Sequence, residues 1–309
     1  MKGRLFLRFI GLMVVVLSVT SVVTSCSKDD DEGPGSSSNR NANDSSQEAA
    51  LARLEFPKVK GGNSVVLIHK TIPAYSDGVN YSSEWDCDKK SQRWTCYQLN
   101  KSLLQSNTSR YTSSTDQYPF DPLLSSQYLS RDLIKGSGFD HGHICPSADR
   151  LYSAEINKQT FYLTNMQPQY KAFNGSFSGN EAFKNSWSPW YQLEDQVRTW
   201  ARATTTEMLY VVKGGTIESD QLLMTKDELL VPKYFFVALL LKNAQGYKAV
   251  GFWMEHKSSY GSKLPYVDCA VNIRTLEQKT GIDFFCNLPD NIEEKVETLP
   301  IENVKRAWF

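Results

Sequence analysis

The segment GFDHGHICPSADR, residues 138–150, places His141 and His143 two residues apart in a chain that has only four histidines. In an extended strand, side chains two residues apart point to the same face. The two rings could therefore bind one metal ion, share a proton or have separate roles. The sequence on either side of this segment is needed to choose among these possibilities.

Several segments on both sides of the histidine motif are typical of strands. They are rich in Val, Tyr, Phe and Leu, and Gly, Pro, Asn or Asp separate them. The predicted strands are residues 63–70, 93–99, 209–214, 234–241 and 247–254. The chain shows no regular β-α-β alternation, which predicts an α+β fold with a mostly antiparallel central sheet.

One segment has a strong helical pattern. Ser188 is expected to cap its start, with Pro189 in the first turn. Four large apolar residues then recur at three- and four-residue steps, as in a buried stripe: Trp190, Leu193, Val197 and Trp200. A second, weaker helix is predicted from about 272 to 280, ended by Gly281.

The first 25 residues have basic side chains followed by an apolar run, which is typical of a signal peptide. The ending VTSC resembles a lipobox, so Cys26 is expected to carry lipid and attach the protein to a membrane; the alternative is an ordinary export signal with an incidental cysteine. Residues 26–50 are polar and predict a flexible tether. Residues 51–309 are expected to form one folded domain, anchored at the bacterial outer membrane, on the cell surface or the periplasmic face.

Charge and cysteine content restrict the partners and the covalent structure. The chain has 34 basic and 34 acidic residues, and removal of the signal leaves a formal net charge of −3. A polyanion would therefore be bound by local basic patches. Cys87 and Cys96 flank a predicted hairpin turn and could form a disulfide, Cys269 and Cys286 could form another, and Cys145 would then be free.

Two kinds of chemistry suit the histidine pair. A catalytic zinc site normally needs three protein ligands. Asp140 or Cys145 could help, but the remaining histidines, His69 and His256, fall within or at the end of predicted core strands. Alternatively one histidine acts as a general base, because imidazole titrates near neutral pH. A magnesium ion would then be held by oxygen ligands and would suit a phosphodiester substrate.

The order of motifs resembles the DNA/RNA non-specific endonuclease family. Three segments carry the resemblance: DHGHICPSADR (140–150), TFYLTNMQPQYKAFN (160–174) and WYQLEDQVR (190–198). The likeness continues into VVKGGT (211–216), VPKYFF (231–236) and TGIDFF (280–285). It implies a ββα-metal active-site core and hydrolysis of DNA and RNA to 5′-phosphate ends with Mg²⁺, for which Mn²⁺ can substitute. No protein partner is predicted.

The resemblance also implies roles for individual residues. His143 matches the general base, and Arg110 is placed where an arginine stabilises the transition state. Asn174 is the expected metal ligand, Glu194 would reach the ion through coordinated water, and Arg198 would neutralise phosphate charge. The signature further adds Asp140 and His141, and the T-N motif adds Asn165, which could equally fix a turn.

Two departures from the family pattern affect these expectations. His141 replaces the usual arginine, which predicts lower activity, a shift toward acidic pH or an altered substrate. The segment between Asn174 and the helix is long and contains Asn185, a rival ligand. Two other functions therefore remain: a surface lipoprotein that binds nucleic acid with an impaired site, and a secreted zinc hydrolase.

Overall fold

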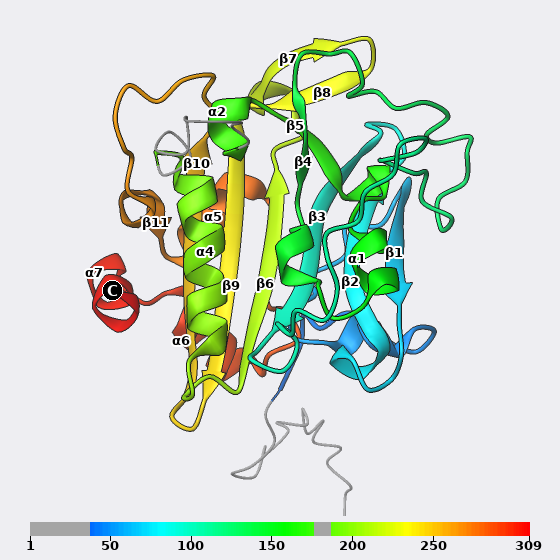
Figure 1. Cartoon of the computed structure of the whole chain (residues 1–309). Helices are drawn as coiled ribbons and strands as arrows, with labels where there is room; N and C mark the ends of the chain where they lie inside the picture. Colours follow the sequence, from blue (N-terminus) through cyan, green and yellow to red (C-terminus); the bar gives the residue numbers. More distant parts are fainter. Residues whose placement is uncertain (1–37, 176–186) are drawn as a thin grey trace, which may run out of the picture. The chain divides into compact units, whose positions relative to one another are not determined.

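The computed structural model describes residues 38–175 and 187–309 (Figure 1). The predicted signal peptide, Cys26 and Asn185 lie outside the described residues. Within these two ranges, no helix is both long enough and apolar enough to cross a membrane.

An antiparallel sheet forms the centre of the fold, in the order β1-β2-β3-β6-β9-β10-β11. Its strands are β1 (Ser64–Lys70), β2 (Val79–Asp86), β3 (Ser91–Leu99), β6 (Met208–Gly215), β9 (Tyr234–Asn243), β10 (Gly246–Glu255) and β11 (Ala270–Val271). Two small two-stranded sheets accompany it: β4 (Asp140–His143) with β5 (Met166–Gln169), and β7 (Leu222–Lys226) with β8 (Leu229–Pro232). The predicted α+β class with a mostly antiparallel sheet is confirmed.

The helices are α1 (Ala154–Gln159), α2 (Lys171–Asn174), α4 (Pro189–Arg202), α5 (Ile273–Thr280), α6 (Asp290–Glu297) and α7 (Ile301–Trp308). Ser188 caps α4 by accepting a hydrogen bond from the backbone N–H of Tyr191, and Pro189 is in its first turn. Asn272 caps α5, and Gly281 ends it in the left-handed conformation. Both helix predictions are confirmed.

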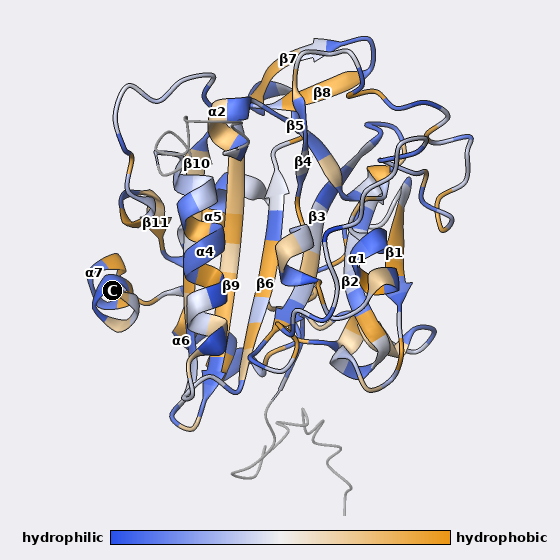
Figure 2. Cartoon of the chain, in the orientation of Figure 1, coloured by the Kyte–Doolittle hydropathy of each residue, from blue (hydrophilic) through white to orange (hydrophobic). Residues whose placement is uncertain are grey.

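Strand β9 shows how the sheet is covered on both faces. Successive side chains of a strand point to opposite faces. Accordingly, Phe235, Val237 and Leu239 pack in one core cluster with α4, whereas Phe236, Ala238 and Leu240 pack in another with α5 and α6. Figure 1 shows α4 on one side of the sheet and α5 and α6 on the other, and Figure 2 shows β9 as a largely hydrophobic strand.

Two expectations about covalent and domain structure are wrong. All five described cysteines are free, and Cys96 lies opposite Ser82 across the predicted hairpin, several residues away from Cys87. The predicted tether also ends earlier than residue 50. Asn43 donates its side-chain amide to the carbonyl of Pro57 at 3.0 Å and accepts from the N–H of Val59, so the chain is already packed there.

Candidate active site

The two-stranded sheet of β4 and β5 fixes the two histidines of the motif. Asp140 pairs with Gln169 across the two strands, and His143 pairs with Met166. A Cβ atom added to Gly142 would lie 2.2 Å from Cδ of Gln169. Glycine is therefore required between the histidines, because the Gln169 side chain lies directly over that position.

A cavity of about 610 Å³ opens beside β4. It is lined by seven of the predicted site residues: Arg110, Asp140, His141, His143, Asn174, Glu194 and Arg198. They come from the loop before β4, from β4 itself, from the end of α2 and from α4. Segments separated by up to 88 positions are thus brought to one place, with both histidines on the same side of β4.

His143 is held by an aromatic contact and has an unused ring nitrogen. Its ring meets the Phe161 ring edge-on, with centroids 4.7 Å apart. None of the described residues offers a hydrogen-bond partner to its buried Nε2 atom. Burial, and then the charge of Arg110, lower the pKa of His143 to about 3. The imidazole is therefore neutral at physiological pH, with the Nε2 atom not engaged by any of the described residues.

Arg110 contacts the same Phe161 ring as His143. Its guanidinium carbon is 4.7 Å from the centroid of the Phe161 ring, a cation–π contact. Burial lowers the pKa of Arg110 from its ordinary value, but a guanidinium remains charged. Phe161 therefore positions both a neutral base and a permanent positive charge at the cavity wall.

Asn174 and Glu194 supply oxygen ligands of the kind that hard cations prefer. Asn174 ends α2 and donates its amide to Oδ2 of Asp140 at 3.2 Å. The next residue, Gly175, has φ +76°, and a Cβ there would lie 2.6 Å from Tyr191. Glu194 accepts a hydrogen bond from Nζ of Lys213 at 2.7 Å, which fixes its carboxylate at the cavity.

Arg198 is oriented by a carboxylate from another part of the chain. Its guanidinium donates to Oδ1 of Asp149 at 3.0 Å. Burial acts to lower the pKa of Arg198, but the charges of Asp149 and Glu194 outweigh it and raise the pKa. Asp149 thus holds Arg198, and Lys213 holds Glu194. The two residues are therefore not simply an exposed ion pair with each other along one helix face.

His141 occupies the position where the family signature has arginine. Its ring stacks on Tyr118 with centroids 3.8 Å apart and planes inclined by 8°. Its Nε2 contacts Oδ2 of Asp132 at 2.9 Å. Burial acts to raise the pKa of Asp132, but the hydrogen bond and charge of His141 outweigh it and lower the pKa. Tyr118 and Asp132 therefore fix the orientation of the His141 ring at the cavity.

The sequence profile of the DNA/RNA non-specific endonuclease family matches residues 66–291. The chain belongs to this family. The match contains all eight predicted site residues and both strands of the two-stranded sheet that carries His143. As the family name states, the substrates of the family are nucleic acids.

Individual members of the nuclease family are similar to this chain over most of its length. A nuclease from Nostoc sp. is 28% identical over 228 residues, covering 71% of this chain and 75% of the relative. Mitochondrial endonuclease G from Bos taurus is 26% identical and covers 66% of each chain. The crystal structure of the EndoG/EndoGI complex matches with a TM-score of 0.55 and 20% identity, covering 72% of this chain and 87% of that one. This structural likeness confirms the fold with its ββα-metal core.

Asn165 is the one predicted site residue that does not line the cavity. Its side chain accepts from the N–H of Cys145 at 2.8 Å and donates to the carbonyls of Cys145 and Thr160 at 2.9 and 2.7 Å. It is fully buried. A direct contact with substrate is contradicted by this placement, because the amide already joins the loop after β4 to the segment before β5. Asn165 is a positioning residue.

The other two histidines have structural partners, as expected. Nε2 of His69 contacts Oδ2 of Asp121 at 2.8 Å, and both residues are buried. His256 accepts from the N–H of Tyr170 at 2.7 Å, and its Nδ1 lies 2.9 Å from the carbonyl of Pro232. These contacts occupy both ring nitrogens of His256 and Nε2 of His69, and neither residue lines the cavity, so the zinc alternative lacks a third histidine there.

Several residues at the site were not predicted from the sequence. Phe161, Lys213 and Asp149 all lie in segments that carry the family likeness, so position within a motif could have indicated them. Asp132 and Tyr118 lie in a long loop with no periodic pattern. Their contacts with His141 depend on tertiary structure, and no sequence signal identified them.

Proposed function

We propose that this protein is a magnesium-dependent endonuclease that hydrolyses phosphodiester bonds of DNA and RNA without sequence specificity. The observation that carries the proposal is the neutral His143, whose Nε2 is unpartnered among the described residues, in one cavity with Arg110, Asn174 and Glu194. A general base, a positive charge and oxygen ligands are the components that this reaction needs.

The residues present fit a hydrated divalent cation. Asn174 would bind the ion directly, and Glu194, fixed by Lys213, would hold its coordinated water. Magnesium commonly keeps several waters and needs only one or two protein ligands together with substrate phosphate. When bound, the ion neutralises charge on the phosphate and stabilises the leaving oxygen.

The protein side chains then account for the remaining steps. His143 takes a proton from a water molecule, whose oxygen attacks phosphorus while the bond to the 3′ oxygen breaks. The 3′ oxygen leaves as a hydroxyl after gaining a proton from solvent, and the phosphate stays on the 5′ end. Arg110, beside His143, and Arg198, held by Asp149, offset the additional negative charge at phosphorus.

Low sequence specificity is consistent with such a site, because contacts to the sugar-phosphate backbone carry no base information. We also propose that the protein is exported and anchored by lipid on Cys26, with a tether leading to the folded domain. This part rests on the sequence pattern of residues 1–37 alone.

The test is cleavage of supercoiled plasmid and of RNA by the purified protein. Mg²⁺ should support cleavage, Mn²⁺ should substitute, EDTA should abolish it, and His143→Ala should be inactive. DNA ligase should rejoin the nicks without prior phosphorylation, because the ends carry 5′-phosphate. Intact substrates with both metals across pH 5 to 9 would favour a binding protein. Activity with zinc but not magnesium would favour the alternative hydrolase.

A further inference from the structure

A second cavity, here called the acidic pocket, lies behind the central sheet and has a volume of about 490 Å³. It is lined by α5, the loop after it, α6 and residues 40 and 41. Six carboxylates line it: Glu277, Asp283, Asp290, Glu293, Glu294 and Glu297. Two arginines, Arg40 and Arg274, also line it, so acidic groups exceed basic ones by four.

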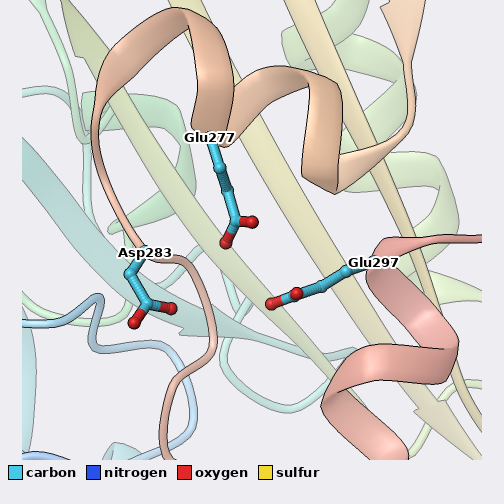
Figure 3. Close-up of side chains that lie close together, drawn as sticks. All are labelled: Glu277, Asp283 and Glu297. Carbon is cyan, nitrogen blue, oxygen red and sulfur yellow. The ribbon is translucent and has the colours of Figure 1, made fainter. Parts of the chain in front are cut away.

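Three of these carboxylates converge. Glu277, Asp283 and Glu297 each offer an oxygen, and these oxygens lie within 4.8 Å of one another. Figure 3 shows the three side chains pointing toward a common space from α5, from the loop after α5 and from α6. Three negative charges at this spacing repel one another strongly unless a positive charge lies between them.

The protein itself supplies little positive charge for this space. Arg274 is shared among three carboxylates, at 3.4 Å from Glu277, 2.8 Å from Glu294 and 2.9 Å from Glu297. Among the side chains of residues 38–175 and 187–309, the hydrogen-bond donor to Asp283 is a neutral one, the amide of Asn41 at 3.1 Å. The charges at the centre of the acidic pocket are therefore incompletely compensated by the described side chains.

An independent observation points to a missing ligand. Glu297 is only 3% exposed, and among the described residues its Oε1 atom has no hydrogen-bond partner. The Oδ1 atom of Asn41, whose amide nitrogen reaches into the same cluster, is likewise buried without a partner in this part of the chain. A buried oxygen without a partner is costly, and more so when the group is charged.

We propose that Glu277, Asp283 and Glu297 bind a calcium ion at a site separate from the active-site cavity. Ca²⁺ binds six to eight oxygens at about 2.3–2.6 Å, so two of its ligands can be up to about 5 Å apart. Mg²⁺ needs shorter distances and near-ideal octahedral geometry, which suits this spacing less well. Water in the open pocket would complete the coordination.

A bound ion would also join separate segments of the chain. Its three ligands come from α5, the loop after it and α6, and Asn41 connects the start of the described chain to Asp283 and Glu293.

Thermal unfolding of the purified protein tests the proposal. Calcium at millimolar concentration should raise the Tm by about 5 °C over the value in EDTA, because a ligand that binds only the folded state stabilises it. Glu297→Gln and Asp283→Asn should each lose most of this shift. In EDTA their Tm should equal or exceed that of the wild type, because each change removes a repelling charge, and this distinguishes lost binding from lost folding.

Two control variants separate this site from its surroundings. Glu294→Gln changes a carboxylate of the same pocket that is outside the cluster, and its calcium shift should be retained. Asn174→Ala removes the proposed ligand in the active-site cavity and should also retain it. No shift in the wild type, or a shift that survives Glu297→Gln and disappears in Asn174→Ala, would overturn the proposal.

Discussion

The active-site cavity and the acidic pocket both contain buried charged groups, but they balance charge differently. Around the cavity three carboxylates each pair with a cationic or basic side chain: Glu194 with Lys213, Asp149 with Arg198, and Asp132 with His141. In the acidic pocket three carboxylates share Arg274. The first arrangement orients groups for chemistry, whereas the second leaves negative charge that a bound cation can neutralise.

The largest expected effect is a loss of cleavage rate that follows a change in the active-site cavity and not a change in the acidic pocket. His143→Ala removes the general base, which typically contributes about 10²–10⁴-fold to the rate. We expect cleavage of plasmid DNA to fall about 10³-fold, with an unchanged Tm shift in calcium. Glu294→Gln, at the rim of the acidic pocket, should keep the wild-type rate. Equal rates for His143→Ala and wild type would remove His143 from the mechanism.

The next effect concerns metal use in the cavity. Asn174→Ala should increase the magnesium concentration for half-maximal cleavage about 10–100-fold, because it removes the proposed direct ligand. Asn174→Asp supplies an oxygen at the same place and should restore much of the affinity. The check is a magnesium titration of the initial rate. An unchanged titration for Asn174→Ala would point to a different ligand, with Asn185 the first to mutate.

A smaller effect should appear in the pH dependence of stability. The pKa of folded His143 is lowered to about 3, below its ordinary value of 6.5. Below pH 6.5 the unfolded chain binds a proton there that the folded chain does not, so this contribution to stability is lost as pH falls. As pH falls from 6 to 4, the free energy of unfolding should therefore decline more steeply for the wild type than for His143→Gln. The difference between the two slopes should be up to about 1.4 kcal/mol per pH unit. Denaturant unfolding at several pH values measures this, and parallel curves would contradict the low pKa.

The smallest effect concerns the substitution in the motif. His141→Arg supplies a permanent charge that Asp132 can still pair with. We expect a gain of a few-fold in cleavage rate, because the family position then carries a charge that does not depend on proton binding. Initial rates of both proteins on the same plasmid substrate test it. An equal or lower rate for His141→Arg would mean that a permanent charge at this position does not assist cleavage.

The fold was predictable where hydrophobic patterning is long and regular. Strand β9 and helix α4 were located to within a few residues, because an apolar run and a three-to-four-residue repeat are strong local signals. Strand β2 was not located, since its centre is Ser82, Ser83 and Glu84. These polar residues are buried, and Glu84 is satisfied by distant donors such as the indole of Trp94.

The residues of the site were predictable where they belong to the ordered motifs of the family. Seven residues chosen from the sequence meet in one cavity. For Asn165 the sequence left catalysis and the fixing of a turn open, because a motif position does not reveal which way an amide points; its hydrogen bonds fit the second role. Phe161 contacts His143, and Asp132 contacts His141, through tertiary structure that a motif does not encode. The same holds for the cysteines, since neither of the two possible disulfides forms.

The central claim is that the cavity around His143 hydrolyses nucleic acid with the help of a divalent cation. The most direct measurement is the initial rate at which the purified wild-type protein cuts supercoiled plasmid and single-stranded RNA, in Mg²⁺ and in EDTA. We predict that both substrates are cut in Mg²⁺ and neither in EDTA. Cleavage that is unaffected by EDTA, or intact substrates under both conditions, would contradict the account.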